Sequence, residues 1–167
     1  MKDRGQLHLV IGPVGAGKST FAHRRSAAAR AVFLDLDTWM VRLYGDDPRP
    51  PEGVLAWYLE RRERCRAVLW DTARSILECG TDVYLELGLV RRAERESLCR
   101  AARIEDLDLR VYLVDAPRDL RRERVRLRNH SAAAHVQVVP PEFFEAASDA
   151  WEPPSLAEQH EWDMIIV

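Results

Sequence analysis

The chain is poor in cysteine and in long apolar runs. Its 167 residues include three cysteines (Cys65, Cys79 and Cys99), and these form neither a C-x-x-C pair nor a cluster with histidine. An odd number of widely spaced cysteines predicts reduced thiols and argues against a disulfide framework or a zinc site. No apolar run is long enough to span a membrane, and no separate apolar segment precedes the first predicted strand as in a secretory signal. These absences predict a cytoplasmic protein with no membrane partner.

Charge of neither sign dominates the sequence. There are 25 basic and 27 acidic residues, which leave a formal net charge of −2. This balance disfavours nucleic acid as a partner, because non-specific binding to phosphate backbones needs an excess of basic residues, although a local basic patch stays open. The five histidines have no metal-ligand spacing. The length predicts one domain, residues 1–167, with a core that needs no disulfide or metal support.

Lysine is also scarce, and its position is informative. Only two lysines stand against 23 arginines, and one of them, Lys18, lies in the stretch LHLVIGPVGAGKST of residues 7–20. This stretch is an apolar run followed by the pattern G-x-x-x-x-G-K-[ST], which is the Walker A phosphate-binding loop. A lysine kept in an arginine-rich chain indicates that a compact ammonium group is needed at this position.

Each residue type of this loop has a physical role in holding phosphate. Gly12, Gly15 and Gly17 allow backbone conformations in which consecutive N–H groups point at one anion. Lys18 places its charge between the outer phosphates, and the Ser19 hydroxyl can bind the Mg²⁺ that bridges them. The helix that follows directs its N-terminal dipole at the same charge. The predicted nucleoside triphosphate site therefore comprises Gly12, Pro13, Val14, Gly15, Ala16, Gly17, Lys18, Ser19 and Thr20.

The remaining sequence alternates apolar strands with helical segments. Turn-forming residues at 45–51 and a glycine at 80 delimit the longest predicted helix, 54–79. Strands are predicted at 7–11, 31–34, 82–87, 109–114 and 164–167, and further helices at 18–30, 38–44, 91–102, 118–129 and 141–147. This alternation predicts an α/β fold, with a parallel sheet covered by helices on both faces. The carboxyl ends of the strands then share one edge with the phosphate-binding loop.

Two carboxylates, Asp35 and Asp37, follow the second predicted strand. Beside a Walker A loop they suit phosphoryl transfer to a hydroxyl, because Asp35 can help to hold Mg²⁺ while Asp37 accepts the proton of the attacking alcohol. Asp37 can instead cap the helix that follows. Glu86 stands where a Walker B strand carries its acidic residue. It either orders a metal-bound water, contacts the acceptor, or is a capping or surface carboxylate.

Arginine is concentrated in the predicted helix 118–129. Arg121, Arg124 and Arg128 recur at three- and four-residue spacing and share one helix face. Such a helix is commonly a solvated face with salt bridges, but on a movable segment its arginines can neutralise the charge of a transferring phosphoryl group. We predict that Arg124 and Arg128 are catalytic contacts of this kind. Arg92, after the third strand, either contacts the acceptor or lies on the surface.

These motifs occur in an order that resembles the small P-loop kinases. The Walker A loop is followed by LDLD at 34–37, LELG at 85–88, VDAP at 114–117, the two lid arginines, and WEPP at 151–154. The chain resembles the AAA_33 family, which is zeta-toxin-like and polynucleotide-kinase-like and is similar in plan to chloramphenicol phosphotransferase and shikimate kinase. The resemblance covers nearly the whole chain. It departs from the family at Glu86, where many members carry aspartate.

The resemblance implies a P-loop NTPase fold, a three-layer sandwich around a five-stranded parallel sheet of order 2-3-1-4-5, with a lid at about 118–140. It implies ATP and Mg²⁺ as cofactors, Asp37 as general base, and residues 151–154 near the nucleotide base. The expected activity is transfer of the γ-phosphoryl group of ATP to a hydroxyl of a small molecule. Two alternatives stay open, namely a polynucleotide or nucleotide-sugar acceptor, and ATP hydrolysis by a switch protein. The oligomeric state is open as well.

Overall fold

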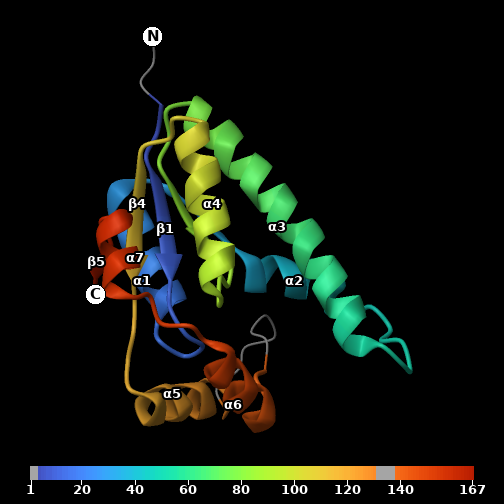
Figure 1. Ribbon diagram of the computed structural model, residues 1–167. Helices are drawn as coiled ribbons and strands as arrows, with labels where there is room; N and C mark the ends of the chain where they lie inside the picture. The colour runs from blue at the N-terminus through green and yellow to red at the C-terminus, as the bar shows by residue number, and fades with distance from the viewer. Residues whose placement is uncertain (1–3, 131–137) are drawn as a thin grey trace.

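The computed structural model of the chain describes residues 4–130 and 138–167 (Figure 1). The strands are β1 (Leu7–Ile11), β2 (Val32–Asp35), β3 (Val83–Glu86), β4 (Leu109–Leu113) and β5 (Ile165–Ile166). The helices are α1 (Lys18–Ala29), α2 (Leu36–Tyr44), α3 (Val54–Glu78), α4 (Arg92–Ile104), α5 (Arg118–His130), α6 (Pro141–Ala150) and α7 (Leu156–Glu161).

The five strands form one sheet in the order β2-β3-β1-β4-β5, and each neighbouring pair is parallel. β1 lies at the centre, where Leu9 pairs with Leu85 of β3 on one side and with Val111 of β4 on the other. The predicted α/β fold and strand order are therefore confirmed. Because all strands run in the same direction, their carboxyl ends meet at one edge, beside the loop that follows β1.

Helices cover both faces of the sheet, so the chain forms three layers (Figure 1). Successive residues of a strand point to opposite faces. Leu9 of β1 packs into the larger core, which also contains Leu77 of α3 and Ala102 of α4. Its neighbour Val10 packs into a smaller cluster with Ala22 of α1. The predicted coverage of both sheet faces is therefore observed.

The longest helix, α3, ends where its sequence predicts. Gly80 adopts a φ of +78°, and the N–H groups of Gly80 and Thr81 donate to the carbonyls of Leu77 and Ile76. This is the Schellman pattern, in which a glycine in the left-handed region satisfies the last helix carbonyls. Within the described ranges no helix, α3 included, combines the length and the apolarity needed to cross a membrane.

Helix α7 lies in a stretch where the sequence predicts no helix, because six residues are too few to show a helical periodicity. Its Glu158 side chain is buried and pairs with Arg95 of α4, with Oε1 2.6 Å from Nε and Oε2 2.9 Å from Nη2. The Arg95 guanidinium also lies over the Trp151 ring, 5.1 Å from its centroid. This buried ion pair joins the segment before β5 to helix α4.

Candidate active site

The loop between β1 and α1 has the backbone geometry of a phosphate-binding nest. Gly12, Gly15 and Gly17 have φ values of +150°, +77° and +103°, a region that residues with a side chain rarely adopt. A Cβ atom at Gly12 would also lie 2.0 Å from the Val114 carbonyl oxygen, so a side chain has no room there. Lys18 begins α1 directly after the loop. The predicted phosphate-binding residues therefore lie at a helix N-terminus, where backbone N–H groups and the helix dipole favour an anion.

Glu86, at the end of β3, contacts the first two residues of α1. Its Oε2 atom accepts a hydrogen bond of 2.9 Å from the Ser19 hydroxyl, and its Oε1 atom lies 3.5 Å from Lys18 Nζ. Burial raises the pKa of the Glu86 carboxyl group, and the nearby carboxylates of Asp37 and Asp35 raise it further, whereas Lys18 and Ser19 oppose the rise. Among the alternatives for Glu86, a surface position is wrong, because its side chain is buried against the loop.

Ser19 and Glu86 together suit Mg²⁺. Hydroxyl and carboxylate oxygens are ligands that Mg²⁺ prefers, and this ion usually takes one or two protein oxygens, several waters and phosphate oxygens. Among residues 4–130 and 138–167, no group of three or more histidine, cysteine, aspartate or glutamate side chains is arranged to hold a metal ion. The donor set fits a metal that binds together with a phosphate ligand.

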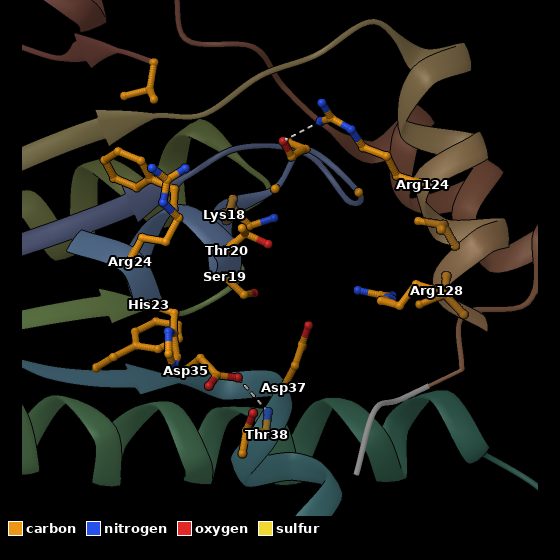
Figure 2. A pocket seen from close by; sticks show the side chains of 18 of the residues that line it. Lys18, Ser19, Thr20, His23, Arg24, Asp35, Asp37, Thr38, Arg124 and Arg128 are labelled. Carbon is orange, nitrogen blue, oxygen red and sulfur yellow. Dashed lines mark hydrogen bonds between the residues drawn. The ribbon is translucent and has the colours of Figure 1, made fainter. Parts of the chain in front are cut away.

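Asp35 and Asp37 have different surroundings although they are two residues apart. Asp35 is the N-cap of α2, because its Oδ1 atom accepts the Thr38 N–H at 2.7 Å. Burial, the largest cause, raises the pKa of the Asp35 carboxyl group. Asp37 belongs to the first turn of α2, so the alternative that Asp37 caps this helix is wrong. Asp37 points into the cavity in Figure 2, whereas the Asp35 carboxylate accepts a hydrogen bond from the Thr38 backbone N–H. A role for Asp35 in holding Mg²⁺ stays a prediction.

Helix α5 faces the loop and the cavity with three of its arginines, as their spacing predicts. Arg124 and Arg128 both line the cavity and point into it in Figure 2, and Arg124 Nη1 donates to the Ala16 carbonyl oxygen at 3.0 Å. Arg121 contacts the loop instead of the cavity. It is buried against the loop, with Nη1 2.9 Å from the Val14 carbonyl oxygen, and it does not line the cavity.

The predicted lid, 118–140, contains α5, and its residues 131–137 lie outside the described residues. Helix α5 packs directly on the phosphate-binding loop. A Cβ atom at Gly15 would lie 2.8 Å from the Arg121 carbonyl oxygen and 2.9 Å from Val125 Cγ2. That this segment moves during a reaction stays a prediction.

The loop, α2 and α5 line a cavity of about 930 Å³. The predicted site residues that it brings together are Gly15, Ala16, Gly17, Lys18, Ser19, Thr20, Asp35, Asp37, Arg124 and Arg128. Arg92 is not among the lining residues, because it lies on an exposed face of α4 with Nε 2.7 Å from Glu96 Oε1. The geometry therefore speaks against Arg92 as an acceptor contact.

Residues 151–154 also lie away from this cavity. Trp151 is buried in the larger core, and the Glu152 N–H donates to the Val90 carbonyl at 3.1 Å. Neither they nor the two prolines after them are among the cavity-lining residues. The structure therefore does not support the placement of this segment beside the nucleotide base.

Some residues around the cavity have no signal in the sequence patterns. Its wall includes His23 and Arg24 of α1, and only their place within two turns of Lys18 could have indicated this.

The turn that follows Glu86 is held by side chains from a distant helix. Arg62 and Arg66 of α3 donate to the Gly88 carbonyl in this turn. Their partner is 26 and 22 residues away, so no local pattern could have found this contact.

Comparison with known proteins agrees with this geometry. A chain of the Pnkp1/Rnl/Hen1 RNA repair complex is 18% identical, with a TM-score of 0.69 over 90% of this chain and 45% of that one. Kti12 from Chaetomium thermophilum, in complex with ADP-AlF3, is 17% identical, with a TM-score of 0.69 over 96% and 88% of the two chains. A gluconokinase from Sinorhizobium meliloti 1021 is 18% identical, with a TM-score of 0.56 over 100% and 83%.

At these identities the likeness shows the fold alone, and the chain spans less than half of the RNA-repair chain that it matches. No curated protein sequence matches the chain. The sheet order and the glycine-lined loop at the end of β1 define the P-loop class of nucleotide-binding folds. The family model AAA_33, described as an AAA domain, matches residues 7–154. The chain belongs to the AAA_33 family, and its fold is that of the small P-loop kinases.

Proposed function

We propose that the protein transfers the γ-phosphoryl group of ATP to a hydroxyl of a small-molecule acceptor. The observation that carries the proposal is the shared cavity. It is lined on one side by Lys18 and Ser19, on another by Asp37, and across from the loop by Arg124 and Arg128. The terminal phosphate of a nucleotide held by the loop would lie beside the Asp37 carboxylate, which does not cap a helix.

The proposed reaction uses these side chains in separate roles. The acceptor oxygen forms a bond to the γ-phosphorus, the bond from that phosphorus to the β-γ bridging oxygen breaks, and ADP leaves. Asp37 takes the proton of the attacking hydroxyl. Lys18, Arg124 and Arg128 stabilise the negative charge on the transferring group, because they are cations that line the same cavity. We propose that Arg128 reaches this group directly.

Ser19 and Glu86 would hold Mg²⁺ in this scheme, with Asp35 close by. The ion, when bound, neutralises charge on the phosphate oxygens. The chain's own contribution is the hydrogen bond from Ser19 to Glu86, which holds the hydroxyl and the carboxylate together beside Lys18. Kti12, which shares the fold, has been solved with ADP-AlF3, and we propose a nucleotide of the same kind for this chain.

An acceptor screen with an Asp37→Asn variant tests the proposal. Purified protein is incubated with labelled ATP and Mg²⁺ in the presence of hydroxylated metabolites, nucleosides or 5′-hydroxyl oligonucleotides. We expect label transfer to a small molecule, and a loss of about 10²-fold or more in Asp37→Asn. Asp46→Asn is the matched control, because Asp46 is exposed and is not among the residues that line the cavity.

Three outcomes would contradict the proposal. Label transfer only to oligonucleotides would favour a polynucleotide kinase. ATP hydrolysis that needs no acceptor and that Asp37→Asn leaves intact would favour a switch protein. A wild-type chain that shows no calorimetric response to ATP or GTP with Mg²⁺ would remove the nucleotide site itself.

A further inference from the structure

Three carbonyl groups of the phosphate-binding loop accept hydrogen bonds from cationic side chains. The N–H groups of a nest are directed at an anion, so the carbonyls of the loop need partners of their own. In this chain three cations supply those partners. Lys18 Nζ donates to the Pro13 carbonyl at 2.9 Å, Arg121 Nη1 to the Val14 carbonyl at 2.9 Å, and Arg124 Nη1 to the Ala16 carbonyl at 3.0 Å.

Arg121 differs from the other two because it is buried, with a relative exposure of 6%. Besides Val14, its guanidinium donates to the Ala116 carbonyl at 3.0 Å and to Ser148 Oγ at 3.1 Å. These partners are all neutral. Within residues 4–130 and 138–167, no carboxylate lies within ion-pair distance of Arg121. Burial lowers the pKa of its guanidinium, and the carboxylates of Asp115 and Glu145, which act on it without a direct contact, oppose that shift.

Other arginines of the chain show that this arrangement is unusual. Arg95 is also buried, but the Glu158 carboxylate neutralises it in a bidentate ion pair. Arg122, next to Arg121 on α5, pairs with Glu145, and its side chain is 47% exposed. Arg121 is therefore a buried cation whose charge the described residues do not neutralise by direct contact.

A buried charge without a counter-charge is costly, because the loss of hydration is not repaid by an ion pair. A protein can tolerate such a charge where a ligand of opposite charge binds next to it. Arg121 is hydrogen-bonded to the phosphate-binding loop through the Val14 carbonyl. A polyphosphate held by that loop would supply negative charge on the far side of this contact.

We propose that Arg121 is a positioning residue whose charge serves as a built-in counter-charge for the polyphosphate, acting through the Val14 carbonyl and the loop. The inference rests on the proposed function, because it assumes that the loop binds a polyphosphate. It differs from the role of Arg124 and Arg128, which line the cavity, because Arg121 is not among the residues that line it.

The proposal has a signature that a purely structural role lacks. If Arg121 only fastened α5 to the loop, Arg121→Lys, which loses the planar fork, would weaken ATP binding as much as Arg121→Met does. If its charge matters, the loss grows with the number of phosphates, because the interaction energy scales with the ligand charge. The same loss of affinity should appear with inorganic tripolyphosphate, which has no base or sugar.

The experiment compares Arg121→Met, Arg121→Lys and, as matched control, Arg122→Met from the exposed face of the same helix. Binding of AMP, ADP, ATP and tripolyphosphate is measured by calorimetry and by ligand-induced thermal shift. For Arg121→Met we expect the Kd of ATP and tripolyphosphate to rise about tenfold, which corresponds to about 1.4 kcal/mol. The Kd of AMP should change about twofold or less, and Arg122→Met should match the wild type.

Arg121→Lys keeps the charge but loses the planar fork that bonds Val14, Ala116 and Ser148 together. It should unfold at a lower temperature than the wild type yet bind ATP within about threefold of it. This variant decides the question even if Arg121→Met does not fold. ATP binding by Arg121→Lys that is weakened tenfold, or an equal loss for AMP and ATP in Arg121→Met, would overturn the proposal. A wild-type chain that binds neither ATP nor tripolyphosphate would instead overturn the proposed function.

Discussion

Replacing Gly15 with alanine tests the contact between the phosphate-binding loop and helix α5. Gly15 has a φ of +77°, and a Cβ atom there would lie 2.8 Å from the Arg121 carbonyl oxygen and 2.9 Å from Val125 Cγ2. Carbon atoms normally keep about 3.5 Å or more from such neighbours. One of the neighbours is helix backbone, so the clash can be relieved only by moving α5 or the loop. Gly53 offers a matched control, because its φ is +69° and a Cβ atom there would have no neighbour within 4 Å among the described residues.

The two substitutions share the backbone cost and differ in the clash. Alanine at positive φ costs about 1–2 kcal/mol, which the smaller entropy of the unfolded chain partly offsets, so Gly53→Ala should lose about 1 kcal/mol. Gly15→Ala adds overpacking of about 1–3 kcal/mol, for a total of about 2–4 kcal/mol. For a chain of this length the melting temperature should fall by about 2–4 °C in Gly53→Ala and by about 4–16 °C in Gly15→Ala.

Thermal unfolding followed by circular dichroism measures both variants under the same conditions, and calorimetry measures their affinity for ATP. We expect Gly15→Ala to lose ATP binding, because the displaced loop no longer directs its N–H groups at one point, whereas Gly53→Ala keeps it. Melting temperatures that agree within about 1 °C, together with unchanged ATP binding, would show that α5 does not pack on the loop as the structure has it.

Two further predictions concern buried charge. Glu158→Gln leaves Arg95 without a carboxylate, so the free energy of unfolding in urea should fall by about 3–5 kcal/mol, whereas the double variant Arg95→Met/Glu158→Met should lose much less. A double variant less stable than the single one would contradict this. Burial raises the pKa of Glu86 in the folded chain, so the folded state holds this proton more tightly than the unfolded state does. The free energy of unfolding of the wild type should therefore fall as pH rises from about 4.5 to that higher pKa. The Glu86→Gln variant should lack this decline in stability, and it should lose Mg²⁺-dependent turnover. Urea unfolding of both proteins across this pH range tests the prediction. Parallel pH profiles of the wild type and the variant would refute it.

Much of the fold and part of the site could be predicted because the signals are local. The glycine spacing of residues 12–17 and the stop at Gly80 depend on backbone conformations that other residues rarely adopt. The alternation of strands and helices predicted the parallel sheet. Once the sheet is parallel, Asp37 and the loop must share its carboxyl edge. The position of Glu86 at a strand end could be predicted in the same way, but its contact with Ser19 could not.

Other features depend on which segments fold against one another. Asp35 and Asp37 both suit a helix cap, and the choice of Asp35 follows from where β2 ends and α2 begins. The three- and four-residue spacing of Arg121, Arg124 and Arg128 predicts one common face, but it does not predict which of them is buried. A helix that packs closely on a loop buries the first of them and leaves the other two at the cavity.

The phosphate-binding loop follows from local sequence, because a nest needs glycine at fixed spacing and no distant partner can replace that requirement. Which charges are neutralised follows from the folded arrangement of the chain. Arg95 pairs with Glu158 and Arg122 pairs with Glu145, while the hydrogen-bond partners of Arg121 among the described residues are all neutral. The physical reason is that burial and ion pairing are set by contacts between segments far apart in the chain, which periodicity and composition do not encode.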